Sequence, residues 1–343
     1  MLTINASGSP HEIGFEHGRQ AAPLVARSIT FYTGLFQKKS KMDWSQVRQT
    51  ALKWVPHLDA HYPALAKEMK GLAEGAGVEY SDILALNIRT EIAFGMFSDG
   101  CTALSWKTEE KSFLGQNWDW MPAQKENLII ANIAQIGKPN ISMVTEAGII
   151  GKIGLNSAGV GVCLNAIRIQ GCDFSRTPVH LCLRLILEST SLDAAVTAVE
   201  QYGCAAAAHM LIADPNGSMG LELTHKTVVK LPMDGKSRVF HSNHLLQTPS
   251  WVTDDGMALG DSKERVVRIR QLSDKLGAFP DEEDIKTVFT DEDGYPGSIN
   301  RACEGKSESA TLFNIVMDLT AKTADVIKGR PTDPDENIKL SFA

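Results

Sequence analysis

The sequence predicts a mixed α+β protein in which helices and strands come in blocks. Residues 10–92 place apolar side chains at helical spacing, whereas residues 113–166 form short apolar stretches bounded by turn residues. Further blocks of both kinds follow to residue 328. Because strands and helices do not alternate one by one, we expect two stacked antiparallel sheets with helices outside them, in one compact unit spanning residues 1–343.

The N-terminal block is predicted to be helical. Apolar residues recur on one face over residues 10–36 and 43–76, with breaks near Pro56 and Pro63. Ser81 and Asp82 are suitable caps for a further helix that reaches residue 92.

The rest of the chain is predicted to be rich in strands. Strands are expected at residues 113–120, 128–136, 141–145 and 238–243, and hairpins at 149–166, 206–224 and 311–328. Helices are expected at residues 178–188, 192–202, 259–277 and 281–289.

Composition excludes several classes of function. A net charge of -7 without long basic runs argues against nucleic acid as a partner, and no apolar stretch is long enough for a membrane span. The N-terminus lacks a secretory pattern, and residues 341–343 do not match a peroxisomal address. Six scattered cysteines without CxxC pairs fit a reducing compartment, so we expect a cytoplasmic protein without a cofactor.

The dipeptide Gly100-Cys101 marks the border between the helical block and the strand-rich block. Glycine leaves its own carbonyl accessible, so the Cys101 thiol could attack it and form a thioester that water opens. Cys101 would then carry an α-amine, whose ordinary pKa of about 7.7–8.0 suits a general base. Gly-Cys is nevertheless a common pair, and the alternative is a buried structural cysteine.

Ten motifs together carry a resemblance that decides between these interpretations. They are HEIGFEHG at 11–18, LNIRTE at 86–91, DGCTA at 99–103, GQNWDW at 115–120, KENLI at 125–129, TEAGIIGKIGLNSAGVGV at 145–162, LRLILESTS at 183–191, SNH at 242–244, ATLFNIVMD at 310–318 and GRPTDPDE at 329–336. In order and spacing the chain resembles the acyl-coenzyme A:isopenicillin N (6-aminopenicillanic acid) acyltransferases of the N-terminal-nucleophile hydrolase superfamily.

The resemblance implies a four-layer αββα sandwich and self-cleavage between Gly100 and Cys101. The products would be a small chain, residues 1–100, and a large chain, residues 101–343, which stay associated. The implied activity moves an acyl group from acyl-CoA or a small amide to an amine, such as a penicillin-type β-lactam nucleus, or to water.

The resemblance also implies roles for individual residues. Cys101 is the nucleophile, Asp119 orients its amine, and Asn243 resembles the oxyanion-hole donor, a contact that is typically worth roughly 2.7–4 kcal/mol. Ser307 resembles a serine that supports cleavage and substrate binding, and Thr102 follows the nucleophile. Arg89 either orients the precursor or an acyl-CoA anion, or forms a structural ion pair with Glu91 or another acid.

Two positions depart from the penicillin-making pattern. Ala103 stands where that pattern has Thr, and Glu308 stands where it has Arg. An acidic side chain beside Ser307 would disfavour a carboxylate-bearing substrate there.

Three other functions stay open at this level. One is an amidase or peptidase with water as its only acceptor, and another is an uncut, non-catalytic binding protein. The third is a metal hydrolase that uses His11 and His17, or His241 and His244, although no third ligand or HExxH pattern accompanies either pair.

Overall fold

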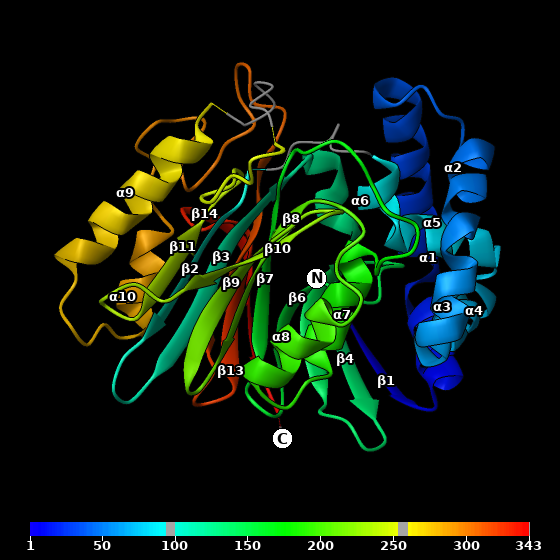
Figure 1. Cartoon of the computed structure of the whole chain (residues 1–343), viewed down its shortest axis with the longest axis horizontal. Coiled ribbons are helices and arrows are strands. Elements are labelled where there is room, and N and C mark those ends of the chain that lie inside the picture. Colours follow the sequence, from blue (N-terminus) through cyan, green and yellow to red (C-terminus); the bar gives the residue numbers. More distant parts are fainter. Residues whose placement is uncertain (94–99, 253–259, 343) are drawn as a thin grey trace.

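The computed structural model describes residues 1–93, 100–252 and 260–342, and two stacked sheets form its centre (Figure 1). The larger sheet contains, in spatial order, β1 (Leu2–Gly8), β4 (Leu128–Gln135), β5 (Ile141–Glu146), β6 (Ile153–Asn156), β7 (Gly161–Ala166), β8 (Ala208–Asp214), β9 (Gly217–Leu223) and β10 (Val228–Pro232). The smaller sheet contains β11 (Arg238–His241), β2 (Thr102–Lys107), β3 (Ser112–Trp120), β12 (Ala310–Asp318), β13 (Thr323–Arg330) and β14 (Asp333–Ser341). Strands β2 and β3 pack face to face against β7 and β8.

Helices cover the outer face of each sheet, which gives the predicted αββα sandwich (Figure 1). Outside the larger sheet or along its β1–β4 edge lie α1 (Pro10–Lys39), α2 (Trp44–Ala51), α3 (Val55–His61), α4 (Pro63–Ala76), α5 (Tyr80–Asn87), α6 (Arg89–Ile92), α7 (Val179–Leu187) and α8 (Leu192–Glu200). Outside the smaller sheet lie α9 (Ser262–Lys275) and α10 (Glu282–Val288). Short 3-10 turns occur at Leu52–Trp54 and Pro122–Asn127.

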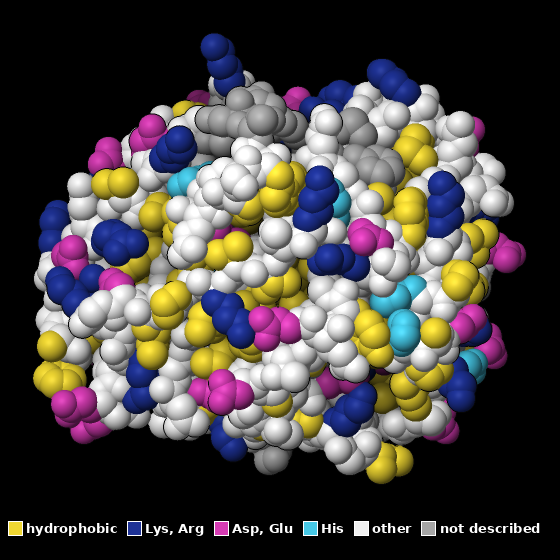
Figure 2. Space-filling view, viewed as in Figure 1, with side chains coloured by type: hydrophobic (Ala, Val, Ile, Leu, Met, Phe, Trp, Pro, Cys, Tyr) yellow, Lys and Arg dark blue, Asp and Glu magenta, His cyan; other side chains and the backbone are white. Residues whose placement is uncertain are grey.

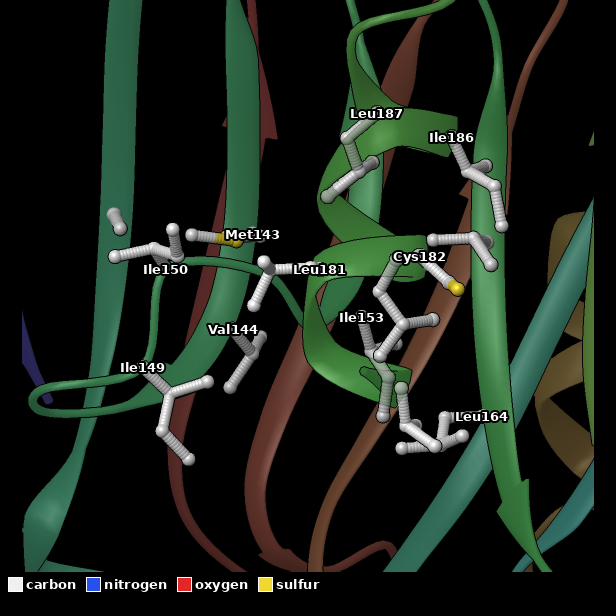
Figure 3. Close-up of a cluster of buried hydrophobic side chains, with 14 of the residues drawn as sticks. Met143, Val144, Ile149, Ile150, Ile153, Leu164, Leu181, Cys182, Ile186 and Leu187 are labelled. Carbon is white, nitrogen blue, oxygen red and sulfur yellow. The ribbon is translucent and has the colours of Figure 1, made fainter. Parts of the chain in front are cut away.

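Helix α7 shows how a helix is fixed to the larger sheet. Its apolar face, with Leu181, Cys182, Ile186 and Leu187, points into a buried cluster that includes side chains of β5, β6 and β7 (Figure 3). Burial of this apolar face stabilises the packing of α7 on the sheet by roughly 25 cal/mol per Å² of apolar surface removed from water.

Helices α1 and α4 cross at unusually close range because glycines face each other across the contact. A Cβ built on Gly14 would lie 1.8 Å from the Glu68 carbonyl oxygen, and one on Gly71 would lie 2.1 Å from the His11 carbonyl oxygen. Helix α1 begins sharply, because Ser9 and Glu12 form a capping box and Pro10 occupies the first turn.

Some predicted boundaries are wrong for identifiable reasons. Ser81 and Asp82 do not cap their helix from outside. They lie in its first turn, where the Asp82 carboxylate accepts a hydrogen bond from the backbone N–H of the cap residue Glu79. Strands β1, β10 and β14 were not predicted; β14 is almost wholly polar and exposed, so its sequence lacks the alternation that marks a half-buried strand.

The helices and the surface charges of the described chain can be compared with what membranes and charged partners require. No helix in residues 1–93, 100–252 or 260–342 is both long and apolar enough to cross a membrane. On the face shown in Figure 2, basic and acidic side chains are interspersed rather than gathered by sign.

Candidate active site

Cys101 lies fully buried at the entry to β2, in the smaller sheet. Strand register explains which segments meet it. Thr102 is opposite Asn117 of β3, and Ala103 is opposite His241 of β11. Because these neighbours run antiparallel to β2, Asp119 and Asn243, each two residues further along, reach the edge where Cys101 lies. The smaller sheet thus gathers the three predicted catalytic residues at one edge.

Asn243 is hydrogen-bonded directly to Cys101. The backbone N–H of Cys101 donates to Asn243 Oδ1 at 2.8 Å, and the same oxygen accepts from Arg265 Nη2 at 2.8 Å. Asn243 Nδ2 donates to the Ala166 carbonyl oxygen at 3.0 Å. The side-chain oxygen therefore faces Cys101 and the NH₂ group faces β7. The oxyanion-hole role of Asn243 stays a prediction.

Two buried arginines complete this cluster, and sequence reasoning missed both. Arg265 of α9 donates from Nη1 to the Cys101 carbonyl oxygen at 2.6 Å and to Thr102 Oγ1 at 2.9 Å. Arg301, in the loop before β12, donates to Asp119 at 3.2 Å. Asp261 accepts from both guanidinium groups, at 3.1 Å from Arg265 and 2.6 Å from Arg301.

Asp119 sits at the base of the cluster with no exposed surface. Burial raises the pKa of its carboxyl to about 7, although Arg301 and Arg265 favour the ionised form. Thr311 Oγ1 donates to Asp119 at 2.7 Å and accepts from the Arg301 backbone N–H at 3.0 Å. These contacts fix both partners of the ion pair.

Gly100 is packed against Arg301. A Cβ at Gly100 would lie 2.3 Å from Arg301 Nε, so only glycine fits without displacing the guanidinium. Asp99, which precedes it in the motif, lies outside the described residues. Ser307 is also in this neighbourhood, because its Oγ lies 3.3 Å from Arg301 Nη1 and donates to the Ser309 carbonyl oxygen at 2.8 Å.

Glu308 is turned away from the cluster. Its side chain is 64% exposed and forms an ion pair with Lys39 of α1 at 2.8 Å. Glu308 stands where the family pattern has arginine, and its charge pairs with Lys39 of the N-terminal helices at the surface.

Arg89 belongs to a group of buried polar side chains around Glu146. It binds Glu146 at 2.8 Å, and Lys152 and Tyr32 contact the same buried carboxylate. The acid in its ion pair is therefore Glu146, while Glu91 accepts from the backbone N–H of Val179. These opposite charges hold the pKa of Glu146 well below its usual range despite its burial.

A pocket adjoins the cluster on the side of β7 and β8. It is small, with about 40 Å³ of space that a water-sized molecule could occupy, and its walls are mostly apolar. Leu164, Ala166, Val179 and Trp120 line it together with Ala93, Ile167, Ile169, Ala206, Ala207, Ala208, Thr90 and the polar Arg89. The Ala166 carbonyl oxygen, which accepts a hydrogen bond from Asn243, connects this pocket to the cluster around Cys101.

The histidines of the metal alternative have other partners. His241 lies between the Ser242 carbonyl oxygen and Glu222, and His17 accepts from the Gly148 backbone N–H. In the described part of the chain no three His, Cys, Asp or Glu side chains gather as a metal site would require.

The fold and the site define a class first: an αββα sandwich with a buried cysteine at the entry to a central strand. A mutant conjugated bile acid hydrolase from Clostridium perfringens shares this fold, with a TM-score of 0.51 and 14% identity over 71% of this chain and 92% of that one. Penicillin V acylase from Agrobacterium tumefaciens superposes with a TM-score of 0.49 and 10% identity, over 71% and 86% of the two chains.

The particular family follows from sequence comparison. Residues 106–333 match the model of acyl-coenzyme A:6-aminopenicillanic acid acyl-transferase. A relative from Emericella nidulans, described as the 40 kDa form of acyl-coenzyme A:6-aminopenicillanic-acid-acyltransferase, is 40% identical over 348 residues, covering 100% of this chain and 97% of its own length. The chain belongs to this acyltransferase family, which confirms the resemblance.

Proposed function

We propose that the protein is a self-cleaving cysteine acyltransferase and amidohydrolase. It cuts between Gly100 and Cys101 and then uses the new N-terminal Cys101 to carry acyl groups. The observation that supports this most directly is the 2.8 Å hydrogen bond from the Cys101 nitrogen to Asn243 Oδ1. A prepared acceptor already faces the atom that would become the α-amine.

The cut would proceed in two steps. Cys101 Sγ attacks the Gly100 carbonyl carbon, and collapse of the tetrahedral intermediate breaks the peptide C–N bond and leaves a thioester. The nitrogen of Cys101 takes up a proton as it leaves. Water then opens the thioester, which gives a carboxylate at Gly100 and restores the thiol.

The mature enzyme would repeat this chemistry on an external acyl donor. The α-amine of Cys101 takes the thiol proton while Sγ attacks the donor carbonyl, and the departing amine or CoA thiol receives that proton. An acceptor amine or water then attacks the acyl-Cys101 thioester and releases the product. Asp119 and Asn243 would hold the α-amine in place, and Arg301 would hold Asp119.

The apolar pocket is the proposed site of the acyl chain. Its walls of Leu164, Val179 and small alanines would remove apolar acyl surface from water next to Cys101. The relative's name points to acyl-CoA as donor and to 6-aminopenicillanic acid as acceptor. Because Glu308 pairs with Lys39 on the surface, its acidic charge would not oppose a carboxylate-bearing acceptor beside Ser307.

The two chains would stay together after the cut. Strand β1 belongs to the small chain but pairs with β4 of the large chain from Leu2 to Gly8. The buried ion pair between Glu68 and Arg184, at 2.7 Å, also joins the two parts. Separation would expose an unpaired strand edge and uncompensated buried charges. The proposed product is therefore a heterodimer, which we place in the cytoplasm.

Denatured intact mass tests the proposal. The wild type should give chains of roughly 11 and 26 kDa, which are 100/343 and 243/343 of 37.3 kDa, with the larger starting at Cys101 as the mechanism requires. Cys101→Ala should remain one chain. An uncut wild type would overturn the proposal and favour a non-catalytic relative.

Product analysis then separates transfer from hydrolysis. With acyl-CoA and 6-aminopenicillanic acid, an acyltransferase forms the N-acyl amide, whereas an amidase forms only free acid and amine. Release of free acid alone, whichever amine is added, would restrict the function to hydrolysis.

A further inference from the structure

We infer that Arg265 is a positioning residue that keeps the α-amine of mature Cys101 uncharged, so that this amine can act as the base. The inference rests on the proposed function, because only a cut chain has this amine. Nothing in the local sequence of α9 distinguishes Arg265 from Arg268 and Arg270, which follow on the same helix. Its burial does, because only 2% of its surface is exposed.

The geometry places the guanidinium group around Cys101. Nη1 binds the Cys101 carbonyl oxygen at 2.6 Å, and Nη2 binds Asn243 Oδ1 at 2.8 Å. The Cys101 nitrogen is 2.8 Å from that same Asn243 oxygen. Arg265 Nη2 and the future amine nitrogen therefore lie no further apart than twice 2.8 Å. The positive charge is held there by Nε, which is bonded to Asp261 at 3.1 Å.

A fixed cation at this distance opposes protonation of the amine. An ordinary α-amine has a pKa of about 7.7–8.0 and would be mostly protonated at neutral pH. A nearby like charge and burial both disfavour the ammonium form. Arginine suits the role because its guanidinium stays charged and its planar fork can bind the carbonyl and amide oxygens together.

Other charged groups face the same place from each neighbouring element. Arg301 adds a second cation, and Asp261 and Asp119 add carboxylates, of which Asp119 is only partly ionised near neutrality because burial raises its pKa to about 7. His244, on the loop after β11, is uncharged there because burial lowers its pKa to about 4. Arg265 differs from Arg301 in binding Cys101 and Asn243 directly.

The test uses variants that should shift the pH dependence of kcat/KM in opposite directions. In the wild type, kcat/KM should fall at low pH as the amine becomes protonated, which gives the pH profile an acid limb. Arg265→Gln should move that limb to higher pH by about one unit, and Arg265→Lys, which keeps the charge, should restore it to within a few tenths of a unit. Asp261→Asn removes an anion and should move the limb to lower pH. A merely structural role would not produce opposite shifts.

A substrate-free titration separates this inference from the proposed function. The ¹³Cα shift of Cys101 in cysteine-labelled mature protein reports the amine pKa even if no acyl substrate is turned over. If the wild type is cut but neither variant shifts this titration, or both shift it in the same direction, the inference is overturned and the proposed function stands.

Cleavage failures also have defined meanings. If Arg265→Gln stays uncut while Arg265→Lys is cut, the charge of Arg265 is needed before the amine exists, and the inference about the mature amine fails. If both variants stay uncut, Arg265 has a structural role and the inference fails. An uncut wild type overturns the proposed function itself.

Discussion

Replacing Gly100 by alanine tests whether cleavage depends on the close packing of Arg301. The added Cβ would meet Arg301 Nε at 2.3 Å, Cζ at 2.7 Å and Nη2 at 2.8 Å, whereas ordinary contact begins at 3.4 Å. Either Gly100 or the guanidinium must therefore move by about 1 Å. Arg301 cannot retreat freely, because Asp261 and Asp119 hold it at 2.6 and 3.2 Å.

The expected effect on cleavage is large. A retreat of about 1 Å would stretch the Arg301–Asp119 contact beyond hydrogen-bonding distance. A misplacement of that size at a reacting centre costs on the order of 100-fold in rate. We therefore expect Gly100→Ala to convert to two chains about 100 times more slowly than the wild type, with a folded precursor accumulating.

The assay is a time course of intact mass on freshly purified precursor, with circular dichroism to confirm folding. Gly34→Ala is the matched control, since a Cβ there meets no atom within 4 Å. It should be cut at the wild-type rate. Cleavage of Gly100→Ala within about threefold of wild type would refute the packing argument, because a 1 Å displacement would then cost almost nothing.

Two further predictions concern stability and specificity. Burial raises the pKa of Glu91 to about 7, so the folded chain binds this proton more tightly than the unfolded chain. The contribution of Glu91 to the unfolding free energy should therefore fall by up to about 1.4 kcal/mol per unit as pH rises from 4.5 toward 7, and Glu91→Gln should remove that contribution to the slope in urea unfolding; equal slopes in the two proteins would contradict it. Ala207→Phe should fill the pocket and lower kcat/KM for octanoyl donors more than about 10-fold while acetyl donors change little; a uniform loss would place the acyl chain elsewhere.

Local pattern explains which parts of the fold could be read from the sequence. Apolar spacing located most helices and the central strands, because that spacing decides which face of each segment is buried. Strand β14 was not predicted because only Leu340 within it is buried, so its sequence shows no apolar alternation. Its hydrogen bonds to β13 hold it in the sheet instead. Strand β1 was not predicted because its seven residues pair with a strand that is more than 100 residues away in the sequence.

The candidate site also contains residues that the sequence predicts and residues that only the structure reveals. Cys101, Asp119 and Asn243 were predicted by resemblance, since each lies in a recognisable motif, and the register of β2 with β3 and β11 brings them to one edge. Arg265 and Arg301 could not be predicted, because each follows Cys101 by more than 160 residues in a segment with other charged side chains. Tertiary packing alone buries these two arginines and aims them at Cys101 and Asp119.

The sequence by itself determined the fold class and the family and predicted Cys101 as the nucleophile, because periodicity and short motifs are local properties of the chain. The tertiary structure decided which charges surround Cys101, that Arg89 pairs with Glu146 and that Glu308 faces Lys39. The physical reason is that electrostatic environment depends on distance and burial, and both are set by segments that meet only when the chain is folded.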